Sequence, residues 1–262
     1  MPYCKTFKQR IKELEIKTQN IEALLSGYKE TGNEEIAQRF ERELDNILQE
    51  IEEFKQEFKT QATQLIEEFV QRRENKNEKV EIIFDERDGR FIIEGGLDFS
   101  SRTHLDDFSN LIKEITGYLN ARNTKTINLP NLKEIGGFFY AQNAQTINLP
   151  NLEKIGGYFD AHNAQTINLP NLKEVGKFFW VHAQAQTINL PNLEKIGGNF
   201  YAGEVQTINL PNIKEIGGDI HFHENNSNLN SLIEVAREWR EKGILKGKIK
   251  ISDKEGNLVQ EF

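Results

Sequence analysis

The chain has 262 residues, of which 37% are hydrophobic and 28% are charged, and its formal net charge is −8. That length allows one large domain or two modest ones, each with an apolar core. The acidic balance argues against a protein dedicated to nucleic acids or to anionic membrane surfaces, because both of these need basic patches.

The N-terminal segment and the cysteine content indicate where the protein works. The single cysteine, Cys4, cannot form an intrachain disulfide. Residues 1–17 lack the apolar segment and the cleavage site of a signal peptide. No apolar stretch approaches the roughly 18 residues of a membrane helix. We therefore expect a cytoplasmic protein that binds neither membranes nor nucleic acids.

Residues 1–75 are expected to form a helical arm. Apolar residues follow a heptad rhythm over residues 5–29, and a second apolar stripe with spacings of three and four covers residues 36–69. The second stripe indicates a helix of about 40 residues, which would be 60 Å long. The first helix can cover only part of the second. The pattern leaves open an intramolecular helical hairpin and a coiled coil through which residues 5–74 form a homo-oligomer.

Residues 76–116 are expected to cap the N-terminal end of a repeat array. The segment 80–96 is typical of a β-hairpin that turns at Asp88-Gly89. The segment 105–115 follows as a short helix or a degenerate coil. A cap is needed because the end of a stacked array exposes its apolar core.

Residues 117–224 contain an internal repeat. Five copies occupy 117–136, 137–156, 157–176, 177–197 and 198–217, and a sixth begins at 218 and then loses the pattern. In the second copy, apolar residues recur at every second position over 139–141 and again over 147–149, as in strands with one buried face. The Leu-Pro-Asn step at 149–151 suits a turn, and the glycine pair at 156–157 suits a second corner. Two short strands and two corners predict one coil of a parallel β-solenoid.

The charged pair before each glycine corner supports stacking of the coils. Its order alternates along the chain, as Lys133-Glu134, Glu153-Lys154, Lys173-Glu174, Glu194-Lys195 and Lys214-Glu215. Equivalent residues of stacked coils lie about 4.8 Å apart, so alternation places opposite charges next to each other. Duplication of an ancestral two-coil unit would produce the same pattern, and both interpretations require a repeat array.

The repeat unit TINLPNLKEIGGFFYAQNAQ, residues 126–145, resembles a known family of repeats. It looks like the leucine-rich repeats of the bacterial surface-antigen (BspA-like) type, in which an I-x-I-P segment, an I-G corner and an A-F segment follow one another. It is also similar to the L domains of growth-factor receptors, which share an N-L-x-x-I-x-G rhythm. The resemblance covers about 117–224 and implies a leucine-rich-repeat solenoid. Such repeats serve adhesion, receptor and scaffold roles, so the family does not name a function.

Residues 225–262 are expected to cap the C-terminal end. Residues 230–243 have the pattern of an amphipathic helix that ends at Gly243. A second hairpin follows, with its turn at Glu255-Gly256-Asn257. The complete expectation is an α+β fold with a helical arm (1–75), an N-terminal cap (76–116), a repeat β-solenoid (117–224) and a C-terminal cap (225–262).

One outward face of the solenoid is the candidate binding site. If Phe139 and Ala141 point inward, then their neighbours point outward, and these outward positions differ from coil to coil while the rest of the repeat is nearly constant. Packing requires repetition, whereas recognition of an irregular partner requires variety. Exposed aromatic residues are also typical interface anchors. The arm or a cap could instead cover these aromatics. The candidate partner-binding residues are Tyr118, Phe138, Tyr140, Tyr158, Asp160, His162, Phe178, Trp180, His182 and Tyr201.

Outward-facing positions of the repeat also bear on metal binding and on ice binding. His162, His182 and Asp160 could be neighbours, but a flat pair of histidines is a weak zinc site, and we expect neither a metal nor a cofactor. The repeated Thr-Ile-Asn places columns of threonine and asparagine on another face, as in ice-binding solenoids. Stacked asparagine amides more often form a structural hydrogen-bond ladder.

Catalysis has little support in the sequence. Motifs for a nucleophile elbow, a zinc protease, a phosphate-binding loop or a dinucleotide site do not occur. We therefore predict a non-enzymatic scaffold that binds another protein or peptide through the variable aromatic face, with the arm for oligomerisation or docking. The alternative is a solenoid that binds carbohydrate or another ligand.

Overall fold

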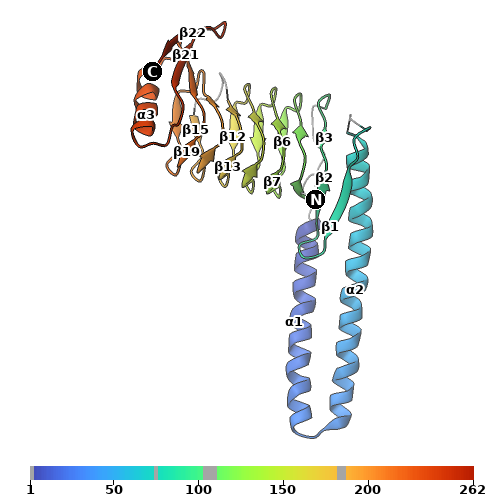
Figure 1. The fold of residues 1–262 in the computed structure, drawn as a ribbon. Coiled ribbons are helices and arrows are strands. Elements are labelled where there is room, and N and C mark those ends of the chain that lie inside the picture. Colours follow the sequence, from blue (N-terminus) through green and yellow to red (C-terminus); the bar gives the residue numbers. More distant parts are fainter. Residues whose placement is uncertain (1–2, 74–75, 103–110, 182–186) are drawn as a thin grey trace. The chain divides into compact units, whose positions relative to one another are not determined.

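The computed structural model describes residues 3–73, 76–102, 111–181 and 187–262. It divides into two compact units, one formed by Met1–Glu68 and Phe84–Arg90 and the other by Phe69–Ile83 and Phe91–Phe262. The first unit is mainly helical and the second is a β-solenoid (Figure 1). The α+β fold class predicted from the sequence is therefore confirmed.

The first unit is built on a helical hairpin. Helix α1 (Tyr3–Glu30) is followed by helix α2 (Glu34–Gln71), and Gly32 between them has a φ of +72° that favours glycine. The ring of Phe7 in α1 lies 4.2 Å from the ring of Phe58 in α2, so the chain folds back on itself. The intramolecular hairpin is the arrangement within one chain, and a homo-oligomer through residues 5–74 stays a prediction.

The strands of the solenoid lie on three faces, and a typical coil contributes one short strand to each face. Two faces carry one continuous β-sheet each, and the third carries a three-stranded and a two-stranded sheet. The sheet that carries the alternating charges is named the charged sheet. Its strands, in spatial order, are β1 (Glu81–Asp85), β2 (Arg90–Glu94), β4 (Ile112–Ile115), β7 (Glu134–Ile135), β10 (Lys154–Ile155), β13 (Glu174–Val175), β16 (Lys195–Ile196) and β19 (Glu215–Ile216).

The other two sheets carry the aromatic and the Thr-Ile-Asn segments and are named after them. The aromatic sheet contains, in spatial order, β22 (Leu258–Glu261), β21 (Ile249–Ser252), β20 (Ile220–His223), β17 (Phe200–Tyr201), β14 (Phe179–Trp180), β11 (Phe159–Asp160), β8 (Phe139–Tyr140), β5 (Leu119–Asn120) and β3 (Leu97–Asp98). The Thr-Ile-Asn sheet has two parts, which are β12 (Thr166–Asn168), β9 (Thr146–Asn148) and β6 (Thr126–Asn128), and then β15 (Thr187–Asn189) and β18 (Thr207–Asn209).

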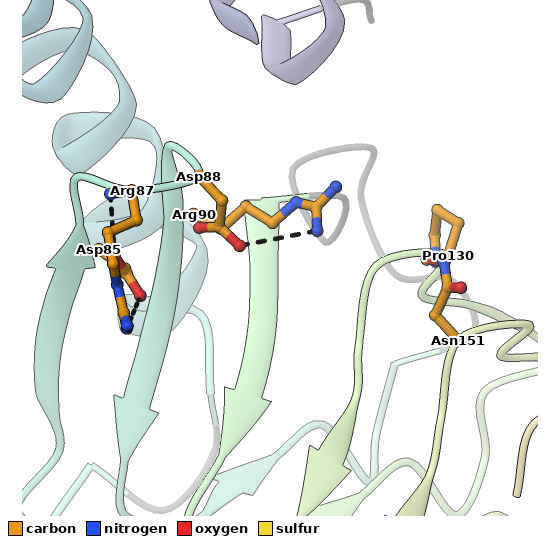
Figure 2. Close-up of polar contacts among 6 residues, drawn as sticks. All are labelled: Asp85, Arg87, Asp88, Arg90, Pro130 and Asn151. Atoms are coloured by element: carbon orange, nitrogen blue, oxygen red, sulfur yellow. Dashed lines mark hydrogen bonds and ion pairs between the residues drawn. The ribbon is translucent and has the colours of Figure 1, made fainter.

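Successive coils stack in register. Phe159 pairs in parallel with Phe139 on one side and with Phe179 on the other, so equivalent positions of the repeat meet. The asparagine of each Leu-Pro-Asn step reinforces this register from the side chain. The Nδ2 of Asn151 donates a hydrogen bond to the carbonyl of Pro130 in the preceding coil at 2.6 Å (Figure 2). Asn171, Asn192 and Asn212 repeat the contact with Pro150, Pro170 and Pro191.

Each typical coil has three strands, whereas the sequence predicted two. The additional strand is the charged residue and the Ile or Val that precede the glycine corner, such as Lys154–Ile155 of β10. A two-residue strand is too short for the alternation of buried and exposed positions to reveal it. It forms because neighbouring coils supply its backbone partners, which are Glu134–Ile135 on one side and Glu174–Val175 on the other.

The core of the solenoid consists of columns of identical or similar side chains. Phe139, Phe159, Phe179 and Phe200 have no exposed surface, and neighbouring rings lie 5.1–5.4 Å apart. The Ile or Val of the charged sheet, such as Ile155, and the leucines of the Leu-Pro-Asn step, such as Leu149, are equally buried. Burial of such side chains is the dominant favourable contribution to folding.

The first glycine of each corner allows the coils to approach closely. A Cβ at Gly156 would lie 2.0 Å from the carbonyl oxygen of Gly136 in the preceding coil. Real Cβ atoms do not come so close to an oxygen, so only glycine fits at this corner without displacement of the backbone.

The N-terminal cap contains the predicted hairpin. β1 and β2 are neighbouring strands of the charged sheet, and Gly89 in the turn has a φ of +66°. The carboxylate of Asp85 accepts two hydrogen bonds from the guanidinium of Arg87, at 2.9 and 2.6 Å (Figure 2). The predicted element at 105–115 lies partly outside the described residues. Its described end is strand β4, which pairs with β2 and β7 as a coil strand does.

The C-terminal cap has the predicted helix and hairpin. Helix α3 (Leu229–Glu241) buries Leu232, Ile233, Ala236 and Trp239. Gly243 follows it with a φ of +71°. β21 continues the aromatic sheet in parallel with β20, and the antiparallel β22 ends it after a turn at Gly256. Among the described helices, none is both long enough and apolar enough to cross a membrane.

Candidate binding face

The outward side chains of the aromatic sheet, named the aromatic face, form three columns that follow the strand register. The first column contains Tyr118, Phe138, Tyr158, Phe178, Asn199 and Asp219. The second contains Asn120, Tyr140, Asp160, Trp180, Tyr201 and His221. The third contains Arg122, Gln142, His162, Gly203 and His223, while the predicted site residue His182 lies outside the described residues. The structure thus places all other predicted site residues in the strands of the aromatic sheet or within two residues of them.

The aromatic rings of the first column stack on one another. The ring of Tyr158 lies 4.7 Å from that of Phe138 and 5.0 Å from that of Phe178, with interplanar angles of 8° and 21°. The Nζ of Lys177 lies 5.3 Å from the centre of the Tyr158 ring, which is a cation–π distance. Lys177 occupies the position where most other coils have their second corner glycine. These contacts hold the column in a fixed arrangement.

The exposure of the aromatic face is greatest in the fourth coil. Phe178 is 40% exposed and Trp180 is 43% exposed, whereas Phe138, Tyr140 and Tyr158 are partly buried. At the N-terminal end, the hydroxyl of Tyr118 hydrogen bonds to a carboxylate oxygen of Glu78 at 2.7 Å. The apolar surface available to a partner is therefore centred on β14.

Two predicted site residues of the aromatic face, Asp160 and His162, contact each other. Asp160 is 6% exposed, and its carboxylate accepts a hydrogen bond of 2.6 Å from Nε2 of Gln142. Its other oxygen lies 2.8 Å from Nδ1 of His162. Asp160 of the second column therefore holds two side chains of the third column, Gln142 and His162, and it presents little surface to a partner.

A groove lies at the C-terminal end of the aromatic face, and it was not among the features predicted from the sequence. It has a volume of about 510 Å³ and includes Trp180, Tyr201 and His221 of the second column. The C-terminal hairpin contributes further lining residues, of which Leu258 is 57% exposed. The residues of the hairpin were missed because only the tertiary structure brings β21 and β22 beside the repeats.

A glycine in the third column opens the groove. Gly203 stands where the first three coils have Arg122, Gln142 and His162, and it contributes no side chain. This single change in a column of long side chains was the signal in the sequence that could have located the groove.

An ion pair and a neutral histidine contribute to the electrostatics of the groove. The Nζ of Lys250 pairs with Asp219 at 2.6 Å, and this pairing lowers the pKa of the Asp219 carboxyl against the effect of its partial burial. Burial lowers the pKa of the His221 imidazole below its ordinary value, and the positive charge of Lys250 acts in the same direction. His221 is consequently neutral at pH 7.

No family model, curated protein or solved structure matches this chain. The β-solenoid arrangement is established by the structure, and the leucine-rich-repeat likeness is one of sequence pattern. The function must therefore be argued from the geometry of this chain.

The Thr-Ile-Asn sheet presents a regular outer face. The Nδ2 of Asn148 donates to the Oδ1 of Asn128 at 2.7 Å, and Asn168 donates to Asn148 at 2.6 Å. Asn209 and Asn189 form the same bond in the second part of the sheet. The predicted asparagine ladder is confirmed within each part, and the sheet is divided between β12 and β15, next to residues 182–186 where the repeat carries its inserted residue.

The charged sheet presents ion pairs between successive coils. Lys154 lies 3.1 Å from Glu134, and Lys173 lies 2.6 Å from Glu153. Lys214 and Glu194, and Lys195 and Glu215, repeat the pairing. The hydrogen bond from Lys173 lowers the pKa of Glu153. The alternation of charges therefore places opposite charges in contact, as the sequence predicts. Within the described part of the chain, no three histidine, cysteine or acidic residues gather as a metal site would require.

Proposed function

We propose that the protein is a non-enzymatic binding module, a solenoid of leucine-rich-like repeats that recognises a protein or peptide through the aromatic face. The interface is centred on Phe178 and Trp180, with Tyr140, Tyr158 and Tyr201 around them. The observation that carries the proposal is the joint exposure of Phe178 and Trp180, at 40% and 43%, within a single coil of the solenoid. Trp and Tyr are the residue types that most often dominate binding energy at protein interfaces.

The order of the face supports recognition by a preformed surface. Stacked rings lose little conformational freedom on binding, because each ring is already held by its neighbours. The rings of Trp180 and Tyr201 lie 5.3 Å apart, and those of Tyr201 and His221 lie 4.4 Å apart. Preorganisation of this kind raises affinity by reducing the entropy lost on association.

The difference between the inner and the outer residues of the aromatic strands also supports a binding role. On the inner side of the same strands, Phe139, Phe159 and Phe179 repeat one residue type. On the outer side, Tyr140, Asp160 and Trp180 differ in size, charge and hydrogen-bonding groups. A surface that served only to close the solenoid would need no such variety, whereas an irregular partner requires it.

Selection of peptides tests the proposal. A random 12-residue peptide library displayed on phage is selected against the immobilised full chain, and the dissociation constants of synthetic binders are measured by calorimetry. We expect the Phe178→Ser/Trp180→Ser double variant to bind the selected peptides at least about 30-fold more weakly, as loss of a hot spot requires. The matched control is the Ile16→Ser/Leu24→Ser variant, which alters two α1 side chains of similar exposure, 48% and 47%.

Three outcomes would contradict the proposal. The control variant could weaken binding as much as the face variant does, the face variant could bind normally, or the library could yield no binder that reaches micromolar affinity. A glycan array run in parallel tests the carbohydrate alternative. Glycan binding that is lost in the Phe178→Ser/Trp180→Ser variant would replace the protein partner with a saccharide.

A further inference from the structure

The groove beside Gly203 has the dimensions of a ligand site. Its volume of about 510 Å³ falls within the range of about 300–1,000 Å³ that is usual for sites of small ligands. It lies across the outer side of the aromatic sheet from Trp180 of β14 to Leu258 of β22, so five neighbouring strands contribute to it. A groove of this size holds a large side chain together with some of its adjoining backbone.

Rings and an aliphatic side chain provide the apolar surface of the groove. Trp180, Tyr201 and His221 form a continuous series of ring contacts at 5.3 and 4.4 Å. Leu258 belongs to the strand that ends the sheet, and both it and Val259 are more than half exposed. An added ring can extend the series of rings, and ring pairs contribute about 0.5–1.5 kcal/mol beyond the burial of their area.

The charged residues of the groove cancel one another. Two are acidic, Glu204 and Asp253, and two are basic, Lys250 and Lys254. Neighbours outside the groove engage most of these charges. Lys250 pairs with Asp219 at 2.6 Å, Asp253 accepts a hydrogen bond from Asn257 at 2.8 Å, and Lys254 lies 3.6 Å from Glu255. The lining therefore complements an uncharged group better than a phosphate, a carboxylate or an ammonium.

From this lining we infer that the groove receives a neutral aromatic side chain of the protein partner, a tryptophan or a tyrosine, as the anchor residue of the interface. The inference rests on the proposed function and adds to it the location and the chemical class of the anchor. Rings in the groove recognise the ring of the partner, and the absence of a side chain at Gly203 provides the space. A partner without such a residue loses the groove contacts and keeps only those with Phe178 and the remaining face.

A substitution that restores a side chain at Gly203 tests the inference. Gly203→Gln introduces the residue that the second coil carries at the equivalent position, Gln142. Gly203 is not among the described glycines with a positive φ, so glutamine fits its backbone. The matched control is Arg122→Gln, which makes the same residue in the same column at the far end of the face.

The probe is N-acetyl-tryptophanamide, titrated against the full chain while the indole N–H signals of the two tryptophans are followed by NMR. We expect the Trp180 signal to shift and saturate with a dissociation constant on the order of 1 mM, in keeping with the small size of the probe. The signal of Trp239, which is buried in α3, should not move. Gly203→Gln should weaken binding at least tenfold and Arg122→Gln should not change it. N-acetyl-leucinamide should bind at least threefold more weakly than the aromatic probe.

Each unfavourable result has a distinct meaning. An unsaturable Trp180 shift, equal binding to Gly203→Gln, or equal binding of the leucine probe overturns the inference. A Trp180 shift with cellobiose and none with the amino-acid amides overturns it in favour of a saccharide. If selected peptides bind normally to Gly203→Gln but not to Phe178→Ser/Trp180→Ser, the groove inference fails while the proposed function stands. If neither variant affects the peptides, the proposed function itself fails.

Discussion

Two outer faces of the solenoid, those of the Thr-Ile-Asn sheet and the aromatic sheet, are formed by the same coils but differ in how their side chains find hydrogen-bond and packing partners. On the Thr-Ile-Asn sheet, the amides of Asn128, Asn148 and Asn168 bond to one another from coil to coil. On the aromatic sheet, successive coils present different groups, and Phe178 and Trp180 remain more than one-third exposed. On a repeating face, the side chains of successive coils can bond to one another because each residue lies next to its own counterpart. On the varied face, neighbouring side chains do not match in this way, and apolar surface remains exposed.

The same contrast holds between the two sides of a single strand. In β14, Phe179 has no exposed surface and contacts the equivalent phenylalanines of the neighbouring coils. Trp180, the next residue, is 43% exposed and contacts Tyr201 and His162. A buried core residue and an exposed residue of the proposed binding face are therefore neighbours along the chain, and substitutions should affect stability at the first and the proposed binding at the second.

The largest loss of folding stability should come from a substitution on the core-facing side of the aromatic strands. Phe159→Ala should destabilise the protein by about 3–5 kcal/mol, because it removes a fully buried ring and leaves a cavity between two others. Phe178→Ala, on the outer side of the next coil, should cost less than about 1 kcal/mol, since surface substitutions rarely cost more. Urea unfolding followed by circular dichroism measures both. Equal losses would show that the outer column is part of the core.

An intermediate loss of folding stability should come from substitutions in the asparagine ladder. Asn148→Ala removes two side-chain hydrogen bonds, whereas Asn189→Ala removes the one bond described there, with Asn209. Net contributions of about 0.5–1.5 kcal/mol for each bond place the loss of the first variant at about 1–3 kcal/mol and that of the second at about half of this. The midpoints of urea unfolding distinguish them. If the order of the two losses were reversed, the ladder would not contribute to stability through its length.

The smallest change in folding stability should come from the titration of His221 on the aromatic face. Because the pKa of His221 is lower in the folded protein than the ordinary value of 6.5, the unfolded chain binds more protons on this residue as the pH falls. Stability should therefore decrease from pH 7 toward pH 5. The groups that face His221 are Tyr201, Lys250 and Asp219.

Replacement of His221 by glutamine isolates this contribution. His221→Gln removes the titrating group, so its stability should decrease less than that of the wild type over the same interval of pH. The carboxyls with a lowered pKa, such as Asp219 and Glu153, lose their contribution mainly below their ordinary values of 3.8 and 4.5, outside this window. Parallel pH profiles of thermal unfolding for the two proteins would contradict the prediction.

The repeat made much of the fold predictable. A twenty-residue period with apolar residues at alternating positions requires stacked coils, because one coil cannot bury its own apolar face. The same reasoning located the Asn148 ladder, the pairing of Lys154 with Glu134 and the cap elements around α3. The third strand, at Lys154–Ile155, escaped prediction because two residues cannot show a periodicity.

The candidate site was predictable only in part. The variable outward positions predicted a binding face centred on Tyr140, Tyr158, Phe178 and Trp180, and its role in binding stays a prediction. They did not reveal that Asp160 is buried against Gln142 and His162, since the sequence does not show which outward side chains cover each other. They also did not reveal the groove, because Leu258 lies 78 positions beyond Trp180 in the sequence numbering.

The sequence by itself determined the coil, its register and the side of each strand that faces the core, because these follow from local periodicity and from the meeting of identical residues. Only the tertiary structure decided that the arm folds back as a hairpin, and that the final hairpin extends the aromatic sheet and lines a groove together with Gly203. Such contacts join segments that share no repeat, and no periodic pattern encodes them.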